Sequence, residues 1–306
     1  QMLKSNVNKM LSKKKEQEAL NYIDKYSREL RETFSVIKEL IQSQISEFVD
    51  ITILPNTANF YPLLIKAYKY DNTVDKSSFR KIARLIEIYS FRVYAVGQSM
   101  PYTGQSRFYN YARDFDGDFQ KLGETIKNTI SEYSSDKRFV ENLSYEDFYN
   151  YYSSNVKNYF FWKYENYIRK YEQPVSGPIS HYDFLNRDKK TRFSIEHIIP
   201  QKVEVEELKI ITKNLKHDKI DDTFEEMYLH SLGNLAIDPM SANASKQNVS
   251  FHIKDSRYFR KAPFKTQNEL EDFLDKKKFT HRSIEKRKEK LIQFAKEYWN
   301  QNGINI

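Results

Sequence analysis

Apolar side chains recur every three or four residues along much of the first half of the chain, which predicts amphipathic helices. The longest such stretch covers about residues 14–49, with apolar positions at Leu20, Ile23, Tyr26, Leu30, Phe34, Ile37, Ile41, Ile45 and Phe48. Two interpretations fit it: a dimerising coiled coil, or one long helix packed on its own domain. We favour the second, because Tyr and Phe are not typical residues of a coiled-coil seam.

The same periodicity predicts further helices at about 59–70, 77–97, 105–112, 117–132 and 145–171. The last contains the run "YFFWKYENYIRKYE". An aromatic face of this kind can stack on nucleic-acid bases, but at helical spacing it is more often core, and we interpret it as core. The segment 173–192 combines Pro, Gly and a charged run, which indicates a boundary loop. We therefore predict a helical spacer domain at 1–175 and a second domain at 176–306.

The second domain changes character. "RFSIEHIIP" is a β-branched run closed by a proline, which is typical of a strand leaving its sheet. Gly233 to Asp238 predicts a turn and a second strand, and Ser241 to Asn248 a short helix with a serine cap. The expected fold class is α+β and predominantly helical.

Composition narrows the setting of the protein. Cysteine is absent, which excludes disulfides and Cys-ligated zinc and favours a reducing compartment such as the cytoplasm. No apolar run reaches membrane-spanning length, so no membrane partner is expected. The net charge of +8 fits a polyanionic partner only weakly. Because the chain begins with Gln1, we expect an upstream domain.

The order of polar residues in the second domain suits phosphodiester hydrolysis. Glu196 and His197 end the first predicted strand, Asn234 precedes the second, and Asn243 lies in the predicted short helix. Histidine suits the task of taking a proton from water, because its pKa lies near neutrality. Carboxylate and amide oxygens suit Mg²⁺, which needs few protein ligands.

These motifs resemble a known family. "EHIIPQ" resembles the HNH, or His-Me finger, nuclease motif, which implies a ββα-metal domain. "SLGNLAI", Asn243, "KQNVSFHIK" and the closing "SIEKRKEKLIQFAKEYW" resemble the C-terminal nuclease domain of GmrSD-type, modification-dependent (type IV) restriction enzymes. The resemblance covers about residues 190–300, and more loosely the helical stretch 59–171, which resembles that family's spacer. The Asp-Gly-Gln-Gln-Arg motif of the family's N-terminal sensor and NTPase module is absent from this chain, as is a Walker A motif.

The resemblance implies a role for each matching residue. His197 is the expected general base, Asn234 braces the histidine loop, and Glu196 and Asn243 are the expected ligands of Mg²⁺ or Mn²⁺. Glu196 stands where Asp is commoner, so its longer side chain is expected to reach the metal through water. Without cysteine there is no zinc knuckle, and the surrounding helices must brace the motif. Phosphate contacts or bracing of the short helix are expected from Lys246, Asn248 and Lys254.

Two further features of the sequence each allow two interpretations. A basic run near the C-terminus is either a solvated face or a surface that binds the DNA backbone. Its candidate DNA-binding residues are Lys278 and Arg282. The run comprises Lys276, Lys277, Lys278, Arg282, Lys286 and Arg287. His230 directly precedes "SLGN" and is either a third site histidine or structural, and we expect it to be structural.

The sequence therefore predicts a metal-dependent DNA endonuclease of the HNH type. Its expected substrate is double-stranded and possibly modified DNA, and its expected setting is restriction or defence against phage. Two alternatives remain open: a DNA-binding or assembly module with an inactive or licensed nuclease site, and a ribonuclease. Oligomerisation is possible.

Overall fold

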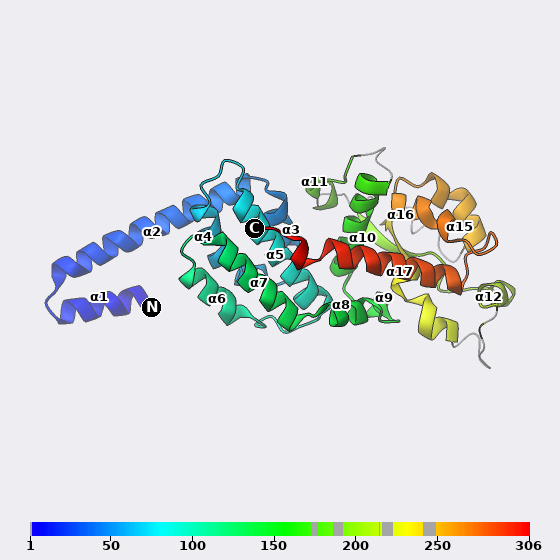
Figure 1. Ribbon diagram of the computed structural model, residues 1–306, viewed down its shortest axis with the longest axis horizontal. Coiled ribbons are helices and arrows are strands. Elements are labelled where there is room, and N and C mark those ends of the chain that lie inside the picture. Colours follow the sequence, from blue (N-terminus) through cyan, green and yellow to red (C-terminus); the bar gives the residue numbers. More distant parts are fainter. Residues whose placement is uncertain (1, 173–176, 186–191, 214, 216–222, 241–248) are drawn as a thin grey trace.

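The computed structural model describes residues 2–172, 177–185, 192–213, 215, 223–240 and 249–306. These residues form a predominantly helical α+β structure with a small two-stranded sheet (Figure 1). The predicted residues Asn243, Lys246 and Asn248, together with the short helix expected there, lie outside the described ranges. None of the described helices is both long and apolar enough to cross a membrane.

The helices before the sheet are α1 (Met2–Ser12), α2 (Glu16–Gln42), α3 (Ser46–Ile53), α4 (Tyr61–Tyr70), α5 (Ser77–Tyr89), α6 (Gln105–Asp114), α7 (Phe119–Tyr133), α8 (Asp136–Leu143), α9 (Phe148–Tyr151), α10 (Ser154–Tyr167) and α11 (His181–Leu185). The sheet pairs β1 (Phe193–His197) with β2 (Leu235–Pro239), and around it lie α12 (Val205–Ile211), α15 (Phe251–Arg257), α16 (Lys265–Asn268) and α17 (His281–Tyr298). Short 3₁₀ helices are η1 (Thr57–Asn59), η5 (Leu232–Asn234), η6 (Phe259–Lys261), η7 (Glu269–Phe273) and η8 (Gln301–Gly303). Stretches of π-helix are η2 (Ser90–Val96), η3 (Ile168–Glu172) and η4 (Glu225–Leu229).

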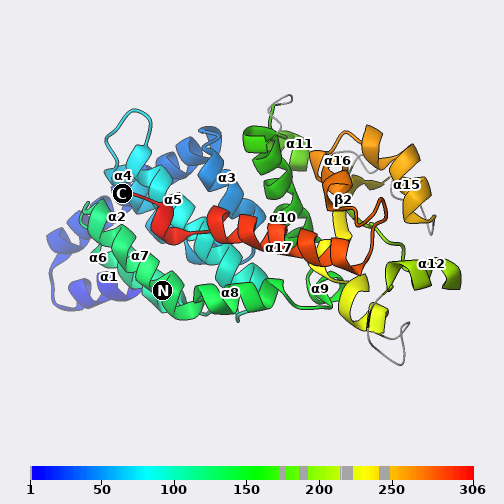
Figure 2. The ribbon, with the colours of Figure 1, turned by 45° about the vertical axis from the view of Figure 1, so that its right-hand side comes forward.

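The predicted long helix at 14–49 is two helices, α2 and α3, separated at residues 43–45. Gln44 at this break has a left-handed backbone conformation with φ of 53°, which a continuous α-helix does not allow. The interpretation that this stretch packs on its own domain is wrong for most of α2. Figures 1 and 2 show α1 and α2 as a hairpin that projects from the body. The stripe's exposed side chains there are Leu20, Ile23, Tyr26, Leu30, Phe34 and Ile41.

The other helix predictions are largely confirmed. The expected helix at 77–97 is α5 continued by the π-helical stretch η2, and the expected helix at 145–171 is α9, α10 and η3. The aromatic run on α10 is core, as expected, because Tyr159, Phe160, Phe161, Trp162 and Tyr164 are all buried. The N-cap position of α5 is Lys76, in a left-handed conformation.

Both predicted strands are present and pair antiparallel, with His197 opposite Leu235 and Glu196 opposite Ala236. Side chains alternate between the two faces of a strand. One face, with Phe193, Leu235 and Ile237, packs into the large core that includes α10. The other face, with Ala236, joins a second core with Phe251 of α15. At the end of β1, His197 therefore lies on the face of the large core, and Glu196 lies on the face of the second core.

Helix α17 crosses the middle of the body, and the residues after it continue to the helices before the sheet (Figures 1 and 2). Its first half lies against the Leu232–Asn234 turn, and just past its end the Trp299 ring stacks on Phe91 at 3.8 Å between centroids. The indole Nε1 of Trp299 donates to Glu87 Oε1 at 2.9 Å. The large core runs from Leu40 to Trp299 and so includes residues on both sides of position 175. The division into domains at 175 stays a prediction.

Candidate active site

His197 ends β1 as a buried side chain surrounded by three neighbours. Its Nε2 lies 3.2 Å from Nδ1 of His230, and its Nδ1 lies 3.3 Å from Nε2 of Gln201. The Tyr149 ring, on α9, packs against the imidazole with centroids 4.4 Å apart. With the Gln201 amide nitrogen as donor, Nδ1 accepts and the His197 proton lies on Nε2. Gln201 is exposed, so the Nδ1 side of the buried imidazole is the side that faces a surface residue.

The surroundings of His197 favour its neutral form. Burial is the main cause, followed by the charges of His230, Lys254 and Lys157, and together they lower its pKa to about 3. An imidazole with this pKa is unprotonated near neutrality and has a lone pair with which to accept a proton.

Asn234 clamps the loop that follows His197. Its Oδ1 accepts from the backbone N–H of Ile199 at 2.9 Å, and its Nδ2 donates to the carbonyls of Ile199 (3.1 Å) and Leu229 (2.8 Å). The Asn234 carbonyl also accepts from the N–H of Ile198 at 2.8 Å. The bracing contacts that the resemblance implied are therefore present, and the role of Asn234 in catalysis stays a prediction.

The turn that carries Asn234 is fixed from behind by α17. Arg287 is fully buried and its Nη1 donates to the carbonyls of Gly233 (3.0 Å) and Leu235 (2.5 Å). Gly233 lies so close to α17 that a Cβ there would overlap the carbonyl oxygen of Ile284. Arg287 is thus not part of an exposed basic face, and that expectation is wrong: its guanidinium packs inside, with Glu269 at 3.5 Å.

Glu196 faces the opposite side of the strand from His197 and forms a buried ion pair with Lys254 of α15. The same Nζ donates to the His197 carbonyl at 2.8 Å. Of the two roles expected for Lys254, phosphate contact or bracing, these contacts match bracing. The ion pair also means that a metal ion would compete with the Lys254 ammonium for the Glu196 carboxylate.

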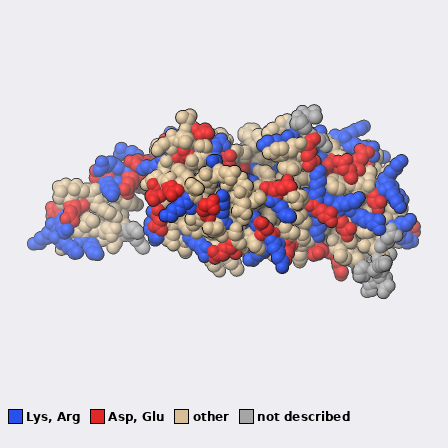
Figure 3. Space-filling model, viewed as in Figure 1, with Lys and Arg blue, Asp and Glu red and all other residues tan. Residues whose placement is uncertain are grey.

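The other predicted positions fall into two groups. Lys278 and Arg282 are exposed, at the Asp275–Lys278 turn and in the first turn of α17, where Arg282 lies 3.9 Å from Asp275. Figure 3 shows Lys and Arg side chains prominent at this end of the molecule, with Asp and Glu interspersed. Asn243, Lys246 and Asn248 lie outside the described residues, and their roles stay predictions.

The side chains that could bind a metal ion are spread over the described residues. Among them, no three or more His, Asp or Glu side chains are placed to hold a metal ion. Glu196 places a carboxylate near the end of β1, and its role as a metal ligand stays a prediction.

Three residues near His197 received no role in the sequence analysis, and a fourth was expected to be structural. Tyr149, Lys157 and Gln201 received no role, although Gln201 stands at the end of the quoted "EHIIPQ". His230, expected to be structural, contacts His197 and stacks on Tyr149 at 5.7 Å between centroids. Its place directly before "SLGN" was the signal available. Tyr149 and Lys157 belong to the helical stretch, and nothing in their local pattern marks them.

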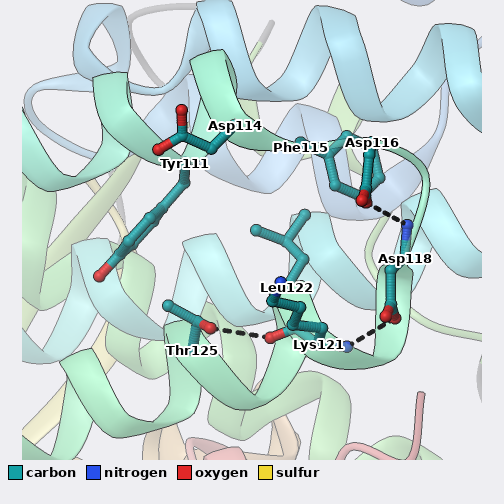
Figure 4. A pocket seen from close by; sticks show the side chains of 8 residues that line it. All are labelled: Tyr111, Asp114, Phe115, Asp116, Asp118, Lys121, Leu122 and Thr125. Carbon is teal, nitrogen blue, oxygen red and sulfur yellow. Dashed lines mark hydrogen bonds between the residues drawn. The ribbon is translucent and has the colours of Figure 1, made fainter.

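A small pocket between α6 and α7 is lined by acidic side chains that already have partners (Figure 4). It has a volume of about 120 Å³ and its wall includes three aspartates. Asp118 accepts from the Lys121 N–H at 2.9 Å, Asp116 from the Asp118 N–H at 3.2 Å, and Asp114 pairs with Arg113 at 2.6 Å. Each carboxylate thus has a local partner, Asp118 as the N-cap of α7, and we assign this pocket no ligand.

A family model described as the C-terminal domain of GmrSD restriction endonucleases matches residues 133–294. The chain belongs to this family. The match includes β1, β2, α15 and most of α17, and it begins well before residue 190, so that α8, α9 and α10 are part of the GmrSD C-terminal domain. Tyr149 and Lys157 therefore lie within the same family domain as His197. Searches of curated proteins and of solved structures gave no match.

Membership in the GmrSD family indicates a nuclease of the restriction-endonuclease type, with DNA as its partner. His197 lies within this family domain, on a loop held by Asn234, and its catalytic role stays a prediction.

Proposed function

We propose that this chain is the nuclease part of a modification-dependent restriction enzyme and hydrolyses phosphodiester bonds in double-stranded DNA. The observation that supports this most strongly is the clamped, neutral His197 at the end of β1, in a chain of the GmrSD family. Defence against phage in the bacterial cytoplasm, an HNH-type site and recognition of modified DNA through an upstream domain are parts of the same proposal.

His197 is the proposed general base. Water takes the place of the exposed Gln201 amide at Nδ1, and the imidazole accepts a proton from that water as it attacks phosphorus. His230 accepts a hydrogen bond from Nε2 and so stabilises the imidazolium that forms. Asn234 and Lys254 hold the backbone on either side of His197 and keep the ring in place during this transfer.

A divalent cation, Mg²⁺ or Mn²⁺, is part of the proposal, with Glu196 and Asn243 as its candidate ligands. When bound, it would stabilise negative charge on the phosphate and on the departing oxygen. Lys254 must move away from Glu196 for the carboxylate to bind this cation directly; otherwise Glu196 reaches it through water.

The experiment is cleavage of supercoiled plasmid by the 306-residue chain in Mg²⁺ or Mn²⁺, with modified and unmodified DNA. We expect nicking or linearisation by the unaltered chain and at least a hundredfold loss in His197→Ala. His252→Ala is the matched control, since His252 is exposed on α15, and it should cleave normally.

Circular dichroism must show that both variants are folded. Cleavage by His197→Ala at the unaltered rate would refute the assignment. Cleavage of RNA but not DNA would favour a ribonuclease, and DNA binding without cleavage on any substrate would favour a binding module.

A further inference from the structure

A polar groove of about 370 Å³ lies between the start of α10 and β1. We call it the α10 groove. Most of its wall is polar or cationic: Ser154, Asn155, Lys157, Asn158, Arg192 and Ser194. Its volume lies within the range of pockets that bind small ligands or single residues of a polymer.

The α10 groove adjoins His197. Tyr149 forms part of its wall, and the same Tyr149 ring packs on the His197 imidazole. Ile195, two residues before His197 on β1, also lines it. A molecule that fills the groove would therefore lie one aromatic ring away from the proposed base.

The charge of the α10 groove is positive. Neither Asp nor Glu is among its lining residues, whereas Lys157 and Arg192 both are. Lys157 is buried; its Nζ donates to the Tyr149 carbonyl and lies 4.0 Å from the centre of the Tyr149 ring. Neither cation forms an ion pair with any carboxylate in the described part of the chain. Burial lowers the pKa of Lys157 and the charge of Asp147 acts in the opposite direction, so an anionic ligand in the groove would favour the charged form of this lysine.

Asn158 adds an acceptor. Its Nδ2 donates to the Phe193 carbonyl at 3.3 Å, while its buried Oδ1 has no hydrogen-bond partner among the residues that the structure describes. A buried polar atom of this kind usually has a partner in the functional state. The groove thus offers cationic donors beside one acceptor, and a nucleotide, with phosphate oxygens and base N–H groups, matches both.

We propose that the α10 groove binds a backbone phosphate and its adjoining nucleotide on the DNA strand that is cut, and so places the next phosphodiester bond at His197. This inference rests on the proposed function and adds a substrate-positioning site supplied by the helical segment before the sheet. Its phosphate contacts are independent of base identity, so the site contributes affinity and register, not sequence choice.

The test uses the full 306-residue chain with His197→Ala, so that a short fluorescein-labelled DNA duplex stays intact during anisotropy titrations. Asn155→Asp places a carboxylate in the groove. Asn155 is exposed in the first turn of α10, where an acidic residue suits the helix dipole, so the helix should fold normally. Asn302→Asp, exposed near the C-terminus, makes the same charge change away from the groove.

We expect Asn155→Asp to raise the Kd for DNA about three- to tenfold at low salt, with the effect shrinking as salt rises. Arg192→Gln should lower the slope of log Kd against log salt by about 1. Asn302→Asp should bind like the parent. Unchanged affinity and unchanged salt slope in both groove variants would overturn the inference.

The same substitutions with His197 intact separate the two proposals. If the groove variants raise KM for plasmid cleavage and leave kcat nearly unchanged, both proposals stand. If the parent fails to cleave but Asn155→Asp still weakens DNA binding, the nuclease proposal fails and the groove remains a DNA-binding site. If cleavage depends on His197 while the groove variants bind and cleave normally, the groove inference alone fails.

Discussion

At the scale of single residues, the site depends on the alternation of a strand. Glu196 and His197 are neighbours in sequence, yet one faces α15 and Lys254 while the other faces Tyr149 and His230. The charged residue is paired with a cation and the imidazole is kept neutral. The alternation thus separates an imidazole whose lone pair is unprotonated from a carboxylate that forms an ion pair.

Asn234 makes several hydrogen bonds that hold the loop after His197, so its substitution should lower the stability of the fold. Asn234→Ala removes three side-chain hydrogen bonds and leaves the buried N–H of Ile199 unsatisfied. We expect a loss of about 2–4 kcal/mol in the free energy of unfolding, measured by urea denaturation.

Asn21→Ala is the control for that prediction, because Asn21 is exposed on α2 and its change should cost less than about 0.5 kcal/mol. Equal stabilities for the two variants would show that the clamp contributes nothing. Cleavage by Asn234→Ala should also fall, because the His197 loop loses its anchor.

At the scale of elements, the sequence carries much of the fold and part of the site. Helical periodicity located α4 to α7 and α10, and the β-branched run before Pro200 located β1. The break between α2 and α3 was missed, because no Pro or Gly marks residues 43–45. Motif order brought together His197 and Asn234. It gave no sign of the Tyr149–His197 ring contact or of the Lys254–Glu196 ion pair, since both join elements that are distant in sequence.

The close approach of α17 to the Leu232–Asn234 turn explains the glycine in "SLGN". Gly233→Ala should force α17 outward and weaken the Arg287 contacts, because a Cβ would overlap the Ile284 carbonyl and lie 3.0 Å from Lys288 Cβ. We expect a destabilisation of about 2 kcal/mol or more, measured by denaturant unfolding.

Gly303→Ala serves as the comparison, since a Cβ there meets no atom within 4 Å. It should be neutral, or slightly stabilising through the unfolded chain. The explanation given for Gly233 would be contradicted if the two variants unfolded at the same denaturant concentration.

At the scale of the whole molecule, α17 and the residues after it join the helical body to the site. Trp299 is fully buried, stacks on Phe91 and bonds to Glu87, whereas the other end of the same helix holds the Asn234 turn. The α1–α2 hairpin extends from this body, with the apolar stripe of α2 exposed.

Trp299→Ala should therefore weaken the whole fold and not only its C-terminus. We expect a loss of about 3–5 kcal/mol and one coincident transition in far-UV and near-UV circular dichroism. Tyr102→Ala, at a largely exposed aromatic, should leave the transition in place. Two separate transitions in Trp299→Ala would show that the two ends of the chain unfold independently.

The central claim, that the His197 imidazole is the base, is tested most directly by chemical rescue. His197→Gly should lose plasmid cleavage, and added imidazole, which fits the space left beside Tyr149 and His230, should restore part of it. The recovered rate should rise with the concentration of neutral imidazole. Cleavage by His197→Gly at the unaltered rate without imidazole would contradict the account.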